Sequence, residues 1–126
     1  MKNSLRNEIL KFVKQKYKIS GDYPWVKYPE IVVLRHPDNK KWFGLIMAVS
    51  YDKLGLNGTE SVDVLNVKKD PLIIGGFIKN KGILPAYHMN KSSWASVLLD
   101  GSVSMKDIEF LLHVSFELTK TTSKGK

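Results

Sequence analysis

The chain has 126 residues, of which 43% are hydrophobic, and it contains no cysteine. This length and content suit one hydrophobic core, so we expect a single domain over residues 1–126. The lack of cysteine excludes disulfides, thiolate nucleophiles and Cys-based metal sites, and no cofactor or metal is expected. No apolar run reaches the roughly 20 residues that cross a bilayer, and the N-terminus lacks a secretory signal, so we expect a cytoplasmic protein without membrane contact.

The charge of the chain is strongly positive. The formal net charge is +8, and residues 1–20 supply +5 of it, from six Lys or Arg and one Glu. A basic surface attracts polyanions such as nucleic acids. Lysine-rich helices are, however, also an ordinary way to keep a small protein in solution, so the charge alone leaves both interpretations open.

Residues 4–17 carry apolar side chains at spacings of three and four, with lysines on the other face. This spacing predicts an amphipathic helix. Ser4 is the expected N-cap, because its hydroxyl can accept a hydrogen bond from a free amide in the first turn. Gly21 marks the region in which we expect the helix to have ended.

Several short runs rich in Val, Ile and aromatic residues predict antiparallel strands. These runs are residues 23–28, 31–36, 42–50, 61–67 and 94–99. The run 42–50 is nearly continuous in apolar residues and is expected to be a central strand. Residues 37–41 are expected to form a hairpin tip, because Pro37 lacks a backbone donor and Asp and Asn suit turns.

Two further helices are predicted in the second half of the chain. Asp70-Pro71 favours the start of a short central helix, because Asp caps free amides and proline at the first helical position loses no needed hydrogen bond. After an extended segment from Ile83 to His88, we expect a C-terminal helix from Ser104 and a frayed basic tail from about residue 120. The prediction is an α+β fold in which an antiparallel sheet packs with N-terminal, short central and C-terminal helices.

A series of segments in chain order resembles a known family. The segments are Val62-Asp63-Val64-Leu65-Asn66-Val67, Asp70-Pro71-Leu72-Ile73-Ile74-Gly75, Gly82-Ile83-Leu84-Pro85-Ala86-Tyr87-His88-Met89-Asn90-Lys91, Trp94 and Leu98-Leu99-Asp100-Gly101-Ser102-Val103, with Pro24-Trp25 and residues 36–47 upstream. Together they closely resemble the MmcQ/YjbR family of small bacterial proteins over nearly the whole chain. The resemblance implies a double-wing arrangement of sheet and helices that is proposed to bind DNA. Because one scaffold can serve unrelated functions, that expectation needs support from the residues themselves.

The candidate DNA-binding residues are mainly lysines in loops and at strand ends. They are Lys40, Lys41, Lys68, Lys69, Lys79, Lys81, His88, Asn90, Lys91 and Trp94. Lysines on a protruding hairpin can reach phosphates without reading the base sequence. His88 and Asn90 could contact base edges and Trp94 could stack on a base. The alternatives are that Trp94 packs in the core and that His88 is a hydrogen-bonded structural residue.

No catalytic motif is recognisable in the chain. His36, His88 and His113 are widely dispersed, and His36-Pro37-Asp38 lacks the spacing that presents two metal ligands on one helix face. There is no nucleophile elbow, P-loop or dinucleotide fingerprint. The chain is therefore not expected to be an enzyme.

The alternative to DNA binding is a protein- or peptide-interaction domain. Its partner would add to a sheet edge or enter an apolar groove around Tyr87, Met89 and Trp94. A small-molecule pocket is a third alternative, which would need a deep hollow with convergent polar groups. The sequence leaves the oligomeric state open.

Overall fold

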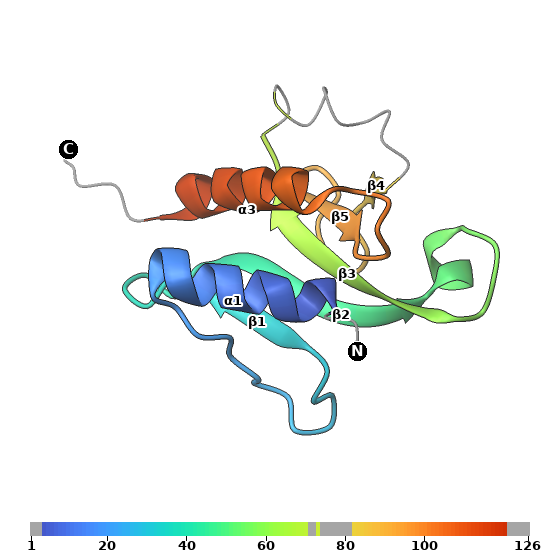
Figure 1. Cartoon of the computed structure of the whole chain (residues 1–126), viewed down its shortest axis with the longest axis horizontal. Helices are drawn as coiled ribbons and strands as arrows, with labels where there is room; N and C mark the ends of the chain where they lie inside the picture. Colours follow the sequence, from blue (N-terminus) through green and yellow to red (C-terminus); the bar gives the residue numbers. More distant parts are fainter. Residues whose placement is uncertain (1–3, 71–72, 74–81, 121–126) are drawn as a thin grey trace.

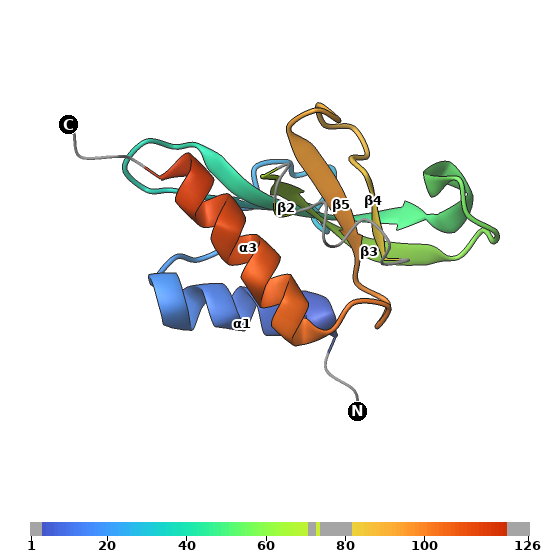
Figure 2. The ribbon, with the colours of Figure 1, turned by 90° about the horizontal axis from the view of Figure 1, so that it is seen from above.

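The computed structural model describes residues 4–70, 73 and 82–120. A five-stranded antiparallel sheet carries two helices on one of its faces, as Figures 1 and 2 show. This arrangement confirms the predicted α+β class. The face of the sheet away from the helices is called the open face below.

The two long helices begin at serine caps. Helix α1 spans Leu5–Tyr17, and the Ser4 hydroxyl accepts a hydrogen bond from the Asn7 amide at 3.1 Å. Helix α3 spans Met105–Thr119, and the Ser104 hydroxyl accepts from the Asp107 amide at 3.2 Å. Both helices are confirmed, because a capping serine before an amphipathic run is a local signal that needs no tertiary contact.

The strands follow the order β1-β2-β3-β5-β4 in the sheet. They are β1 Val32–Arg35, β2 Trp42–Ser50, β3 Ser61–Lys68, β4 Ile83–Pro85 and β5 Trp94–Leu98, and a 3-10 helix, η1 Tyr51–Leu54, follows β2. Four predicted strands are confirmed, although β3 rather than β2 occupies the middle of the sheet. β2 still has a neighbour on each side, which explains its continuous apolar sequence.

The strand predicted over residues 23–28 is wrong. Asp22, just before this segment, forms an isolated bridge to Val33, and the Tyr28 amide then closes a turn by donating to the Trp25 carbonyl at 3.0 Å. Pro24 interrupts the run because it has no amide to donate to a neighbouring strand. The aromatic residues of this segment therefore lie on a turn beside the sheet instead of within it.

Part of the prediction falls on residues that the structure does not describe. The short central helix was expected from Asp70-Pro71 onward, and of residues 71–81 only Ile73 is described. Lys79 and Lys81 also lie outside the described residues, as does the basic tail after residue 120.

The main core lies between the sheet and the helices. Ile9 and Val13 of α1 and Ile108 and Leu112 of α3 are fully buried against it. The open face carries a smaller apolar cluster. It contains Val49, Val62, Val64 and Leu98, and residues of neighbouring loops pack against it. Because side chains alternate along a strand, the apolar sequence of β2 supplies both faces of the sheet, and β3 supplies Leu65 and Val67 to the main core and Val62 and Val64 to the smaller cluster.

Candidate functional site

Strand pairing brings the ends of four strands together at one end of the sheet. Arg35, the last residue of β1, pairs with Trp42, the first residue of β2. Lys68, the last residue of β3, pairs with Trp94, the first residue of β5. Since neighbouring strands run in opposite directions, the β1–β2 hairpin and the segments after β3 and before β5 meet here.

Five candidate lysines lie at this end, which we call the lysine end. They are Lys40, Lys41, Lys68, Lys69 and Lys91. Lys40, Lys41 and Lys91 are exposed, and the other two are half-buried. The described part of the fold therefore gathers lysines that are far apart in the sequence.

The tip of the β1–β2 hairpin is anchored to the end of α3, next to which it lies in Figure 2. The Asn39 side chain donates to the Thr119 carbonyl at 2.9 Å and accepts from the Lys41 amide at 2.8 Å. Lys40 adopts a left-handed backbone with φ 65°, and its amide donates to the His36 carbonyl. These bonds hold both lysine backbones while the side chains project into solvent.

A compact turn presents Lys91. The Asn90 side-chain oxygen accepts from the Ser92 amide at 2.9 Å and from the Ser92 hydroxyl at 2.6 Å. The Ser93 carbonyl accepts from the Lys69 amide at 2.8 Å, which ties this turn to the segment after β3. Asn90 therefore uses its oxygen to build the turn, and a role in reading base edges would be left to its amide group.

Trp94 packs in the core, which was the structural alternative for it. Its side chain is buried, with 9% exposed. The Lys68 ammonium lies 5.6 Å from the centroid of its ring, within the range of a cation–π interaction. Trp94 thus positions a lysine and does not offer a free ring to a base.

His88 does not join the lysine end. It lies on the open face with a left-handed backbone, φ 60°, and its ring centroid is 4.1 Å from that of Tyr87. Its exposed ring lines a hollow with Trp25 and Met47. Of the groove that the sequence suggested around Tyr87, Met89 and Trp94, Tyr87 lines a neighbouring hollow together with His88.

Acidic residues collect at the opposite end of the sheet. Asp52, Glu60 and Asp100 lie there together with one lysine of η1, Lys53, and the Tyr51 hydroxyl donates to the Asp100 carboxylate at 2.9 Å. The segments that carry the five lysines of the lysine end contain two acidic residues, Asp38 and Asp70. Five positive and two negative charges leave these segments with an excess of three positive charges. The described fold is therefore electrically polarised along the strands, which favours approach of an anion to one end.

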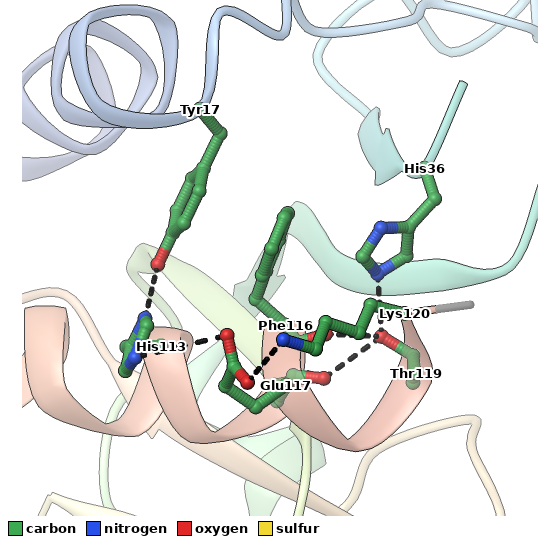
Figure 3. Close-up of polar contacts among 8 residues, drawn as sticks. Tyr17, His36, His113, Phe116, Glu117, Thr119 and Lys120 are labelled. Carbon is green, nitrogen blue, oxygen red and sulfur yellow. Dashed lines mark hydrogen bonds and ion pairs between the residues drawn. The ribbon is translucent and has the colours of Figure 1, made fainter. Parts of the chain in front are cut away.

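A buried histidine supports the base of the hairpin (Figure 3). His36 is 3% exposed, and its Nε2 lies 2.9 Å from the Thr119 hydroxyl. That hydroxyl donates to the Ser115 carbonyl at 2.8 Å, so it accepts from an Nε2–H of His36. Burial lowers the pKa of His36, against the opposing pull of the Asp38 and Glu117 carboxylates.

We expect this lowered pKa to make stability depend on pH. In the unfolded chain His36 titrates at its ordinary pKa of 6.5, above its folded pKa, so the unfolded state binds more protons between the two values. The contribution of His36 to the free energy of unfolding should therefore be complete above pH 6.5 and decrease as the pH falls below that value. Urea titrations between about pH 5 and pH 8 measure this dependence.

The matched variant is His36→Gln, whose amide can replace the Nε2–H donor and does not titrate. Its free energy of unfolding should lose less on acidification than that of the natural protein. Equal losses in the two proteins would contradict the assignment of this pH dependence to His36.

Metal-binding clusters and membrane-spanning helices are not found among the described residues. Across residues 4–70, 73 and 82–120, no group of three His, Asp or Glu side chains could hold a metal ion. No helix in this part of the chain is long and apolar enough to cross a membrane.

Comparison with known proteins decides the family. The family model described as YjbR matches residues 14–118. The chain belongs to the YjbR family. The uncharacterised protein YyaQ of Bacillus subtilis (strain 168) is 48% identical over 115 residues, which cover 91% of this chain and 98% of YyaQ.

Solved structures agree with the fold of this YjbR domain. A crystal structure of a Pseudomonas syringae protein has a TM-score of 0.86 at 43% identity and covers 91% of this chain and 98% of that chain. A Deinococcus radiodurans protein with a DUF419 domain has a TM-score of 0.66 at 20% identity, over 96% of this chain and 83% of that one, and shows the fold alone. The YjbR assignment thus confirms the resemblance noted in the sequence.

Proposed function

We propose that this YjbR protein binds double-stranded DNA through the lysine end, by contacts to the phosphate backbone. The main support for this proposal is the strand register, which brings Lys40, Lys41 and Lys91 to the same end of the sheet as Lys68. Lysine acts on phosphate as a point charge on a flexible stem, so such contacts provide affinity without sequence readout. The proposal assigns no catalytic step to the chain.

The hairpin supports this proposal because it combines projection with a fixed base. Its tip carries two exposed lysines, and the bonds from Asn39 to Thr119 and from His36 to Thr119 hold it against α3. A preorganised hairpin loses less conformational entropy on binding than a free loop would. Lys91 lies on a second turn at the same end, which provides a further contact point along a duplex.

The alternative of adding a partner strand to the sheet has less support from the described edges. β4 has only three residues and ends in Pro85, which cannot donate to a ladder. At the other edge, Val33 of β1 already exchanges hydrogen bonds with Asp22. A very short edge strand, or an edge strand whose backbone groups are already hydrogen-bonded, is a poor site for β-strand addition.

The test is a pair of triple variants with equal charge changes. One replaces Lys40, Lys41 and Lys91 by Gln, and the control replaces Lys11, Lys53 and Lys106, which are exposed elsewhere. We expect the first variant to lose at least about tenfold in affinity for a duplex at low salt, and the control to lose less than about threefold. Fluorescence anisotropy of a labelled duplex measures both affinities.

Equal losses in the two variants would show that only net charge matters and would contradict a site at the lysine end. A natural protein without duplex affinity at low salt would contradict the proposed binding of double-stranded DNA.

A further inference from the structure

The open face of the sheet holds a hollow that the lysine end does not use. Leu45 and Met47, alternate residues of β2, form part of its lining on the face away from the helices. Ile31 also contributes to this lining, and the hollow has a volume of about 220 Å³. Its lining is almost entirely apolar, so water inside it finds few hydrogen-bond partners.

Aromatic rings line this hollow from two directions. Trp25 and Tyr28, from the turn before β1, are 39% and 53% exposed. His88, from the segment between β4 and β5, contributes a third ring. We call this space the ring hollow. Large aromatic side chains that stay exposed around an apolar space are characteristic of ligand sites, because burial in the core would otherwise be favoured.

The segment that carries His88, on one side of the ring hollow, is held in place by a buried polar network. The Tyr87 amide donates to the Ser96 hydroxyl at 2.9 Å, and the Tyr87 carbonyl accepts from the Asn66 side chain at 3.3 Å. Ser96 in turn donates to Asn66, and both of these side chains are fully buried. A satisfied network of this kind fixes the backbone beside it.

The turn that carries Trp25, on the other side of the ring hollow, is held by a backbone hydrogen bond and a ring contact. The turn from Trp25 to Tyr28 is closed by a backbone hydrogen bond of 3.0 Å. The Trp25 ring meets the Trp42 ring edge to face at a centroid distance of 6.1 Å. The rings are therefore held near their positions before a ligand arrives, which reduces the entropy lost on binding.

The ring hollow adjoins the lysine end. Trp42, which contacts Trp25, follows Lys41 directly in the chain. Leu45 in the hollow pairs with Asn66, two residues before Lys68 on the same face. Lys27 is exposed in the turn between Trp25 and Tyr28. Lys27 directly precedes Tyr28, which lines the hollow, and Lys41 directly precedes Trp42, so a ligand in the hollow could place negative charges near these two lysines.

We propose that the ring hollow binds an unpaired nucleobase of single-stranded nucleic acid, with the neighbouring phosphates on Lys27 and Lys41. The base offers flat π-faces to Trp25, Tyr28 and His88, and stacking of this kind tolerates any base. This site extends the proposed function, because it depends on the same lysine end for phosphate contacts. An apolar peptide would use the rings but would leave the adjoining cations without partners.

The first test compares a labelled oligothymidylate with a duplex of the same length. Trp25→Leu and Tyr28→Leu should each weaken binding of the single strand by at least about fivefold. Their duplex affinity should stay within about twofold of the natural protein. Tyr23→Leu is the control, because Tyr23 is equally exposed at 53% but does not line the hollow.

A second test uses the natural protein, so it does not depend on how the variants fold. Amide and side-chain NMR signals of Tyr28, Met47 and His88 should shift on addition of the oligothymidylate. They should not shift on addition of a neutral tetrapeptide that contains phenylalanine. Shifts with the peptide and none with the oligothymidylate would overturn the proposal in favour of a peptide site.

The two proposals fail in different ways. If the duplex binds while the single strand neither shifts the hollow signals nor responds to Trp25→Leu, the nucleobase site is wrong and DNA binding stands. If the single strand shifts the hollow and responds to Trp25→Leu while duplex affinity is absent, the duplex proposal is wrong and the nucleobase site stands.

Discussion

Replacing Phe43 by alanine is expected to lower the free energy of unfolding by about 3–5 kcal/mol, the usual loss for a large aromatic side chain in a core. Phe43 is fully buried where β2 begins, and its ring lies 5.0 Å from the centroids of both His36 and Phe116. The Tyr17 ring of α1 lies 6.0 Å away. The substitution would leave a cavity between both helices and the base of the hairpin. Urea unfolding followed by circular dichroism measures the loss.

The control for this prediction is Phe110→Ala on the outer side of α3. Phe110 is 46% exposed, so its removal should cost less than about 1 kcal/mol. Similar losses for the two variants would show that Phe43 is not a central core residue. Because Phe43 supports the hairpin, its loss is also expected to weaken duplex binding at temperatures where the variant is still folded.

Replacing Ser115 by alanine is expected to cost about 2–5 kcal/mol, because it leaves two buried backbone groups without partners. The Ser115 hydroxyl donates to the Phe43 carbonyl at 2.6 Å and accepts from the Lys68 amide at 2.8 Å. The side chain is fully buried, so water cannot replace it. This one hydroxyl joins α3 to the start of β2 and to the end of β3.

Two measurements check the role of Ser115. Urea unfolding gives the change in stability, and hydrogen exchange should show reduced protection of the Lys68 amide in particular. Ser20→Ala is the control, since its exposed hydroxyl accepts a hydrogen bond from the Lys14 ammonium at 3.1 Å and its loss should cost less than about 0.5 kcal/mol. An unchanged exchange rate at Lys68 would contradict the bridging role.

The sequence predicts the two long helices and the main strands well, for local reasons. Ser4 and Ser104 cap their helices through residues only three positions away, β2 is nearly continuous in apolar residues, and β3 carries Val and Leu between polar residues. The segment 23–28 was assigned to a strand because its composition matches one. The deciding features are Pro24 and the turn at residues 25–28, and the turn depends on contacts with a neighbouring strand.

The sequence predicts the residues of the candidate site but not how they come together. The lysines could be named individually, but their convergence depends on strand register, which is a long-range property. Lys68 lies at the same end of the sheet as the hairpin because β2 and β3 pair with Leu45 opposite Asn66. The ring hollow was missed because Trp25 and Tyr28 were read as strand residues. The exposed aromatic residues on both sides of Pro24 were the available signal.

The most direct test of the lysine end is the salt dependence of duplex binding. The slope of log affinity against log salt concentration becomes shallower by about 0.9 for each phosphate contact that is lost. For the variant lacking Lys40, Lys41 and Lys91, we predict a slope shallower by about 0.9–2.7, while the variant lacking Lys11, Lys53 and Lys106 keeps the natural slope. Identical slopes in all three proteins would contradict phosphate binding at the lysine end.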